Sequence, residues 1–347
     1  MELTKKDTQM AKGMAVLGMV MLHLFCRVED LPYTPLIWFG EIPLIYYLGL
    51  FGDLCVPVFC FCSGYAHYLM ADARKETYAR RIPGKILRFL CNYWIVLMLF
   101  ALLALLFGTS ERIPGSWLDF AGNILLVRMT YNGAWWFVTT YLILLVLSPI
   151  LAAMTKRCNG LLLLAVSFVL YFIAYIFRFK YALTLPHPVL EWLWNQTILL
   201  GTSQLSYLVG MVCRKYGVIG KLRTYLDTRA VLRRSIVFLL PMAAFVGHCV
   251  VRSTFVGPFT AAAAMAGLFL VRLPRPAEQA LLVLGKHSTN IWLVHMFFYS
   301  EPFRDLVFCA EYPILILGLM LLLCFPSAMV IDLVYRPVCG YLERSRI

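Results

Sequence analysis

The sequence predicts an all-α, polytopic integral membrane protein with about ten transmembrane helices, both termini in the cytoplasm and a single domain over residues 1–347. Of the 347 residues, 61% are hydrophobic and only 14% are charged, whereas a soluble domain carries about 25% charged residues. Ten segments are apolar over roughly the 20 residues that a bilayer requires. Lys and Arg concentrate in alternate loops, as in multi-pass proteins. We expect a bacterial cytoplasmic membrane as the location.

The ten apolar segments follow one another without a loop large enough for a second domain. Pro and Gly interrupt several of them, which membrane helices tolerate better than soluble helices do. Residues 31–50 are aromatic and broken by Pro, so we expect them along the outer interface. Residues 116–136 begin with an amphipathic stretch that is typical of a short interfacial helix. The predicted spans are residues 11–27, 50–70, 87–107, 134–154, 159–178, 192–213, 233–251, 254–272, 281–300 and 311–334.

The 31 Lys and Arg residues set the predicted orientation. With the N-terminus inside, 24 of them fall on the cytoplasmic side and seven on the outer side. An error in one segment would scramble this asymmetry, so it supports the number of spans as well as the orientation. The net charge of +13 therefore indicates orientation and contact with phosphates, with no binding to nucleic acid expected. The outer residues are Arg27, Arg112, Arg128, Arg178, Lys180, Arg252 and Arg304.

The eleven cysteines show no CxxC pair and no zinc-type Cys/His spacing, so we expect no metal site. Six of them fall inside apolar segments, where a thiol behaves as a small hydrophobic group. Cys26 and Cys55 are both predicted near the outer surface. They either pair or remain free, because sequence alone does not fix connectivity.

The first apolar segment carries two ionisable residues, Lys12 and His23. Eleven residues of helix make three turns plus about 20°, so both side chains lie on one face, roughly 16 Å apart along the axis. Ionisable groups are costly inside a membrane helix and are usually functional. A cation near one membrane surface and an imidazole near the other indicate a site that works across the bilayer.

A second imidazole, His295, lies in the ninth segment at a depth similar to that of His23. The two histidines are therefore expected to converge on one outer-facing cavity. Histidine is the side chain best suited to take a proton from a hydroxyl near neutral pH. The plainer alternative is a histidine at the membrane boundary that bonds to a backbone carbonyl.

A basic cluster enters the third segment from the cytoplasm. Arg81, Lys85 and Arg88 are spaced four and three residues apart, so they share a helix face. The orientation rule accounts for Arg81, but Arg88 lies one turn inside the apolar segment. Phosphate is the natural ligand for a guanidinium at that depth. Together with Lys12, the cluster predicts a cationic pocket on the cytoplasmic side.

The sixth segment is unusually polar for a membrane span. Its polar residues are expected to face the interior of the bundle, where they either line a substrate path or bond between helices. These residues are Asn195, Gln196, Thr202, Ser203 and Gln204.

Five motifs in this order resemble the membrane-bound acyltransferase-3 family, and together they cover nearly the whole chain. No single motif is specific, but five in order with ten spans are fairly specific together. The motifs are the Lys12-to-His23 spacing, GDLCVPVFCFCSGY (52–65), KILRFLCNYW (85–94), GAWWFVTTYLILLVLSPIL (133–151) and HSTNIWLVHMFF (287–298).

The resemblance implies an O-acyltransferase that moves an acyl group, most often acetyl, from cytoplasmic acyl-coenzyme A to a hydroxyl of an extracytoplasmic glycan or glycolipid. His23 would act as general base or as a transient acyl carrier, and His295 would orient or assist. The remaining assignments are the coenzyme A phosphates to Lys12, Arg81, Lys85 and Arg88, and the substrate to Ser63, Tyr93 and Trp136.

Three positions depart from the family pattern. Lys12 stands where Arg is usual, which keeps the charge but loses the guanidinium fork. Asn92 replaces a Pro, and Cys60 replaces an aromatic residue. None of these changes removes a histidine, so the expected activity is kept.

Two other classes of protein are compatible with ten polar-lined spans. One is a secondary transporter or flippase of a glycan intermediate. Against it, the chain has no repeated half, its basic cluster is one-sided, and Asp53 and Asp332 lie near segment ends rather than as a coupled pair. The other is a structural subunit of an export complex, which would leave His23 and Arg88 unexplained.

Overall fold

The computed structural model describes residues 2–108, 111, 113–300 and 303–344, with no side-chain description for residues 75, 76 and 343. The described chain is helical apart from one small antiparallel hairpin, in which β1 (Trp38–Phe39) pairs with β2 (Ile42–Pro43). The all-α prediction is therefore confirmed.

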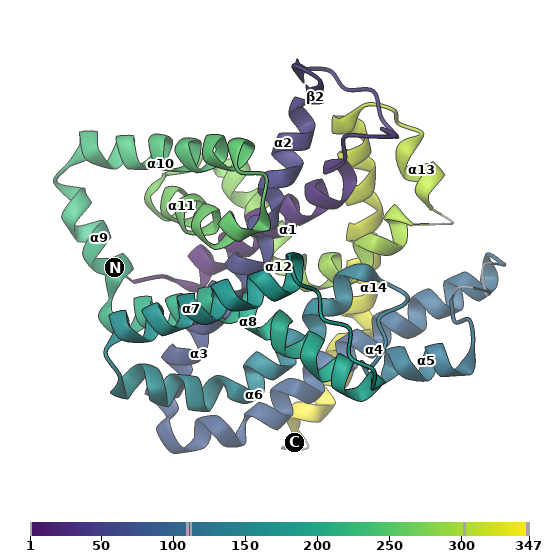
Figure 1. Cartoon of the computed structure of the whole chain (residues 1–347), viewed down its shortest axis with the longest axis horizontal. Helices are drawn as coiled ribbons and strands as arrows, with labels where there is room; N and C mark the ends of the chain where they lie inside the picture. Colours follow the sequence, from purple (N-terminus) through teal and green to yellow (C-terminus); the bar gives the residue numbers. More distant parts are fainter. Residues whose placement is uncertain (1, 109–110, 112, 301–302, 345–347) are drawn as a thin grey trace.

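Figure 1 shows α10 and α11 lying above α7 and α8, with α14 on the far side of the central helices α1 and α12. The α-helices are α1 (Lys5–Phe25), α2 (Leu44–Leu50), α3 (Cys55–Arg80), α4 (Ile82–Leu106), α5 (Trp117–Ile124), α6 (Trp136–Arg157), α7 (Gly160–Phe179), α8 (Pro188–Tyr216), α9 (Val218–Asp227), α10 (Ala230–Val250), α11 (Gly257–Leu270), α12 (Arg275–Tyr299), α13 (Arg304–Phe308) and α14 (Pro313–Arg344). The 3-10 turns are η1 (Phe51–Leu54), η2 (Gly133–Trp135) and η3 (Thr254–Val256).

Seven helices of the described chain are long and apolar enough to cross a membrane, namely those that contain α1, α3, α4, α6, α7, α10 and α14. The other three predicted spans fall on α8, α11 and α12. The helix α11 has only 14 residues, about 21 Å of rise against a hydrocarbon core of about 30 Å. The helices α8 and α12 are long enough but carry more polar side chains. A multi-pass architecture is therefore supported, and the count of ten stays a prediction.

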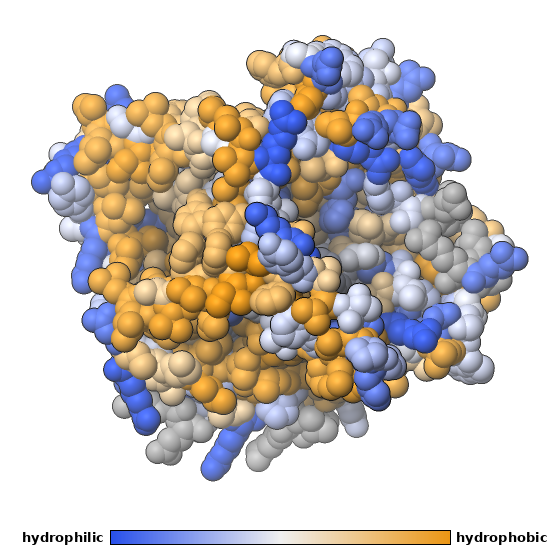
Figure 2. Space-filling model, in the orientation of Figure 1, coloured by the Kyte–Doolittle hydropathy of each residue, from blue (hydrophilic) through white to orange (hydrophobic). Residues whose placement is uncertain are grey.

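A broad hydrophobic surface covers α7 and α10, as Figure 2 shows, and hydrophilic residues gather toward the edges of that view. Many apolar side chains on these helices are exposed, including Leu161 on α7 and Phe238 on α10. Such a surface is too large and continuous for a monomeric soluble protein and suits contact with lipid.

The two stretches expected at the outer interface contain short structured elements. Residues 31–50 hold the β1–β2 hairpin and α2. Residues 116–136 begin with α5, where Ser116 caps the helix by accepting a hydrogen bond from the Asp119 backbone amide. Trp117 on α5 is 81% exposed, as expected for an interfacial helix.

The helices α1 and α12 pack closely and run in parallel through the centre of the molecule. A Cβ atom on Gly13 would lie 2.1 Å from the Leu281 carbonyl oxygen, and one on Gly285 would lie 1.9 Å from the Gln9 carbonyl oxygen. Glycines let membrane helices approach this closely because no side chain separates the backbones. The same holds where Gly64 of α3 meets the backbone of Tyr207 on α8.

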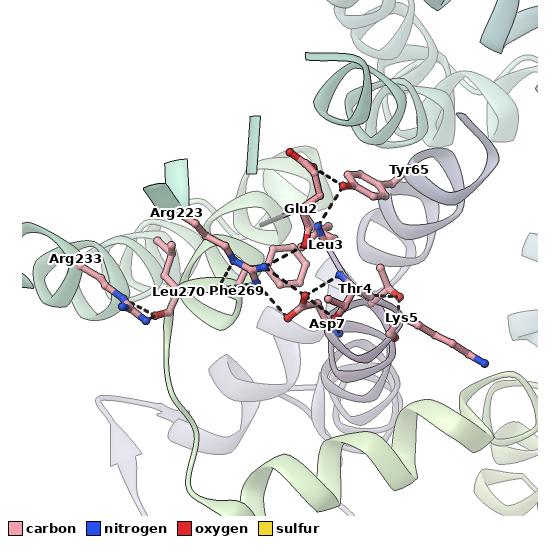
Figure 3. Close-up of polar contacts among 11 residues, drawn as sticks. Glu2, Leu3, Thr4, Lys5, Asp7, Tyr65, Arg223, Arg233, Phe269 and Leu270 are labelled. Atoms are coloured by element: carbon pink, nitrogen blue, oxygen red, sulfur yellow. Dashed lines mark hydrogen bonds and ion pairs between the residues drawn. The ribbon is translucent and has the colours of Figure 1, made fainter. Parts of the chain in front are cut away.

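The beginning of the chain is tied to α9, α11 and α3 by polar contacts (Figure 3). Arg223 Nη2 of α9 donates to Asp7 Oδ1 at 3.1 Å and to the Phe269 carbonyl at 3.0 Å. The Tyr65 hydroxyl of α3 donates to Glu2 Oε2 at 2.5 Å. These contacts fix the first turn of α1 against its neighbours.

Substituting Leu for Gly285 should lower the free energy of unfolding by about 1–3 kcal/mol or more, because the new side chain overpacks the α1–α12 contact. Thermal unfolding of the detergent-purified protein measures the change. The control is Gly318→Ala on α14, where a Cβ meets nothing within 4 Å. That variant should be neutral or slightly stabilising, and equal melting temperatures for the two variants would contradict the packing argument.

Candidate functional site

The two histidines singled out by the sequence face each other across the α1–α12 contact. The ring centroids of His23 and His295 lie 4.9 Å apart with an interplanar angle of 45°. Both residues lie near the C-terminal ends of their helices, and the parallel packing places those ends side by side. The two imidazoles therefore lie side by side, as expected. Their catalytic role and their access from the outer side stay predictions.

His295 is held in one orientation by its own helix. It is fully buried, and its Nδ1 lies 2.8 Å from the Trp292 carbonyl oxygen, to which only a protonated Nδ1 can donate. This bond leaves the Nε2 lone pair available, and Nε2 has no hydrogen-bond partner among the described residues. The backbone-carbonyl bond expected under the plainer alternative is therefore present. It sets the tautomer of an imidazole whose ring lies tilted against that of His23.

A cavity of about 180 Å³ opens beside His23, which is one of its lining residues. Its walls come from α1, η1, α3, η2, α6, α7, α8, η3, α11 and α12. The lining is mainly apolar and aromatic, with a few polar groups, as in most small-molecule sites. The lining residues used below are His23, Asp53, Trp136, Arg178, Thr202, Ser203 and Trp292.

The turn η2 forms one wall of this cavity because it is bonded to α12. Trp135 Nε1 donates to the Leu293 carbonyl at 3.0 Å, and Asn132 Nδ2 donates to the same oxygen at 2.9 Å. Trp292 Nε1 returns a bond to the Ala134 carbonyl at 3.1 Å. These three bonds hold the GAWW segment against the helix that carries His295.

Asp53 contributes a buried carboxylate to the cavity. Its Oδ2 lies 3.0 Å from His248 Nε2, and the two side chains are only 5% and 1% exposed. His248 Nδ1 lies 3.1 Å from the Val251 carbonyl oxygen, which aims the other ring nitrogen at Asp53. The sequence analysis placed Asp53 near a segment end, where it does lie, but missed this pairing because the partner is almost 200 residues away.

Arg178 also reaches the cavity, although the sequence analysis counted it only as an outer charge. Its guanidinium lies 4.7 Å from the centroid of a Trp136 ring, and its Nη1 donates to Thr202 Oγ1 at 3.0 Å. The only sequence signal for this role was a cation at the end of an otherwise apolar segment.

Some polar residues of α8 line the cavity and others bond between helices, which are the two alternatives that the sequence allowed. Thr202 and Ser203 line the cavity. Gln204 instead bonds between helices, since its Oε1 accepts from the Ser167 hydroxyl of α7 at 2.6 Å.

The predicted donor-side cations lie at the other end of α1. Lys12 and Lys85 are both close enough to His67 to act on it electrostatically, and Lys85 is likewise close to Arg88. The Lys85 ammonium also lies 5.3 Å from the centroid of the Tyr78 ring. Arg81 lies exposed at the junction of α3 and α4.

The three residues assigned to the substrate are not brought together. Trp136 lines the cavity, whereas Tyr93 is fully buried and its hydroxyl donates to the Asn123 carbonyl at 2.8 Å. Ser63 lies on α3 beside the close helix contact at Gly64 and is not one of the residues lining the cavity. Of the three, only Trp136 therefore lines the cavity beside His23.

Asn92, which stands where the family usually has a proline, belongs to a chain of polar contacts that joins α4, α12 and α14. Asn92 Nδ2 donates to Asn290 Oδ1 at 2.7 Å, and Asn290 Nδ2 donates to Asp332 Oδ1 at 2.9 Å. Asp332 Oδ2 lies 3.1 Å from His287 Nδ1. A proline at position 92 could not make the first of these bonds.

The disulfide between Cys26 and Cys55 that the sequence left undecided is not formed. Cys26 and Cys55 are both free thiols. No group of three or more His, Cys, Asp or Glu side chains in the described part of the chain is placed to hold a metal ion.

An apolar groove of about 350 Å³ adjoins the cavity and shares Pro57 and Pro258 with it. Its walls come from α3, α7, α8, α9 and α11, and its lining is almost entirely hydrocarbon. The aromatic cavity beside His23, with its few polar groups, therefore lies next to an almost wholly apolar groove.

The architecture and motifs agree with a comparison against known protein families. The family model described as an acyltransferase domain, acyltransferase-3, matches residues 8–333, which is nearly the whole chain. No curated protein and no solved structure shows a significant match. This chain therefore belongs to the acyltransferase-3 family and has the helices of a multi-pass membrane acyltransferase.

Proposed function

We propose that the protein is a membrane O-acyltransferase, and specifically an O-acetyltransferase, that moves an acyl group from cytoplasmic acyl-coenzyme A to a hydroxyl of an extracytoplasmic glycan or glycolipid. The observation that carries the proposal is the close contact of the His23 and His295 rings beside a cavity, in a chain of this family. Lys12, which belongs to the cationic group, lies about 16 Å along α1 from His23. This separation suits a long thioester donor with an anionic end.

In the proposed reaction the acceptor oxygen attacks the thioester carbonyl carbon, a C–O bond forms and the C–S bond breaks. His23 takes the proton of the acceptor hydroxyl because it lines the cavity and has no hydrogen-bond partner among the described residues. The imidazolium of His23 then gives this proton to the departing coenzyme A thiolate. In the other order, a ring nitrogen of His23 attacks the thioester, and coenzyme A leaves as the thiol with the proton of the ring. The acceptor hydroxyl then displaces the imidazole, which takes up the hydroxyl proton.

His295 is proposed as the residue that orients His23. It is buried behind the cavity and held in one tautomer by the Trp292 carbonyl. A fixed neutral ring at 4.9 Å restricts the rotation of the His23 ring and interacts electrostatically with the imidazolium that forms during transfer.

The donor is proposed to bind on the side of Lys12, Lys85 and Arg88, where clustered cations favour the phosphates of coenzyme A. The apolar groove beside the cavity supports a lipid-linked acceptor, since its lining is suited to a hydrocarbon chain. The acceptor sugar would then lie in the cavity next to His23.

We also propose ten spans with both termini in the cytoplasm, in a bacterial cytoplasmic membrane. In this topology α1 and α12 are the first and ninth spans, and both cross from inside to outside. Their parallel packing supports this assignment. The family match favours an acyltransferase over the transporter considered from the sequence.

Replacing His23 with Ala should lower acyl transfer by roughly 10²–10⁴-fold, because a general base contributes a factor of that size. Release of free coenzyme A is measured in proteoliposomes with acetyl-coenzyme A and envelope glycan from the producing cells. The matched control is His187→Ala, since His187 is an exposed histidine at the start of α8. Full activity in a well-folded His23 variant would refute the assignment of the base.

Replacing Lys12 with Met should weaken acetyl-coenzyme A binding about tenfold, which corresponds to about 1.4 kcal/mol. The methionine keeps most of the side-chain volume and removes the charge that would meet a phosphate. Equilibrium binding to the detergent-purified protein measures the change. Lys5→Met is the control, because Lys5 is an exposed cation on the same helix. If wild type binds no acetyl-coenzyme A, the donor site is absent, and an equal loss in both variants would show a non-specific charge effect.

A further inference from the structure

Arg178, which lines the cavity beside His23, has a position that its contacts within the protein do not fully explain. Arg178 lies in the last turn of α7, where a positive charge interacts favourably with the end of the helix dipole. The dipole accounts for a cation at this helix end. It does not account for the guanidinium being turned inward, over Trp136 and into the lining of the cavity beside His23.

The described contacts of Arg178 satisfy only part of the guanidinium. Its Nη1 donates to Thr202 Oγ1, and one face stacks on Trp136. A guanidinium has five N–H donors and a strong preference for carboxylate or phosphate. The guanidinium carbon also lies 5.1 Å from the centroid of the Phe179 ring. Among the described residues no carboxylate forms an ion pair with Arg178.

The carboxylate that shares the cavity is already engaged. Asp53 Oδ2 lies 3.0 Å from Nε2 of His248 on α10, and Asp53 forms no ion pair with Arg178. Of the two residues lining the cavity, Asp53 therefore has an imidazole partner in His248, whereas Arg178 has no carboxylate partner among the described residues.

A second, independent observation marks the same place as a binding site. The Ser203 side chain lines the cavity, is only 3% exposed and has an Oγ atom with no hydrogen-bond partner among the described residues. Buried hydroxyls almost always have a partner, so an unpartnered hydroxyl on a residue that lines a cavity indicates a polar ligand. Ser203 follows Thr202 directly in α8, which places this hydroxyl next to the residue that holds Arg178.

We propose that the cavity beside His23 recognises an acceptor that carries an anionic group, a carboxylate or a phosphate, and that Arg178 binds that group while Ser203 bonds to the sugar. This inference rests on the proposed function, since it names the class of acceptor for the same site. Arg178 and His23 line one cavity of about 180 Å³, so the acylated hydroxyl and the anion lie on the same or on adjacent sugar units.

The test is a binding titration of the detergent-purified protein with glucuronate, glucose 1-phosphate and glucose at constant ionic strength, followed by tryptophan fluorescence. Trp136 and Trp292 both line the cavity, so ligand entry changes their surroundings. At least one anionic sugar should bind ten or more times more tightly than glucose. Arg178→Gln should abolish this preference, and Arg178→Lys should retain part of it.

The matched control is Lys180→Gln, which removes an exposed cation two residues further along the chain and outside the cavity lining. It should keep the preference for the anionic sugar. Ser203→Ala should weaken the binding of all three sugars by a similar factor and leave the preference unchanged. Thermal unfolding of each variant separates loss of binding from loss of fold.

Three results would overturn the inference: no saturable binding of any sugar, equal affinity for all three, or a preference that survives in Arg178→Gln. A response to dihexanoyl-phosphatidylglycerol without a response to either anionic sugar would assign Arg178 to a lipid headgroup and would also overturn it. Acetyl-coenzyme A binding is measured on the same wild-type preparation. If that binding is absent the proposed acyltransferase function fails, whereas if it is present without the anion preference only this inference fails.

Discussion

The close parallel packing of α1 against α12 is the constraint on which the site depends. Backbone meets backbone at Gly13 and Gly285, so the two helices are nearer than any pair separated by side chains. Because the helices run in the same direction, this contact sets their relative height. The same height then places His23 opposite His295 about three turns further along. A bulky residue at the glycine end would separate the imidazoles at the other end.

The helix α1 connects two electrically different regions of the molecule. At its beginning, Lys12 belongs to a group of cations that includes Lys85 near His67. Near its end, His23 borders an aromatic cavity that is lined by the guanidinium of Arg178 and by the carboxyl group of Asp53, which lies beside His248. Ionisable groups inside a bilayer are costly, and the fold lowers that cost by placing each of them in the bundle interior or in a cavity. The proposed transfer across the membrane follows from this arrangement, since donor and acceptor would meet from opposite ends of one helix.

Buried polar pairs hold the helices around the site. Asp53 with His248 joins η1 to α10, and the chain from Asn92 through Asn290 to Asp332 joins α4, α12 and α14. Each group in such a pair would be unsatisfied in hydrocarbon if its partner moved away, so the pairs favour one arrangement of the helices. The wall at η2 is held in the same manner by bonds from Trp135 and Asn132 to α12.

The sequence by itself determined the helical class, the membrane-spanning character, the family and the pair of histidines. These follow from local properties: hydropathy over about 20 residues, the 3.6-residue repeat that puts Lys12 and His23 on one face, and motifs that each lie within one segment. Only the tertiary structure decided which distant residues share the cavity. Asp53 and His248 are far apart in the sequence, Arg178 looked like an orientation charge, and Tyr93 looked like a site residue but is core. Their roles depend on how helices pack and rotate against one another, and hydropathy and spacing within single segments carry no information about that packing.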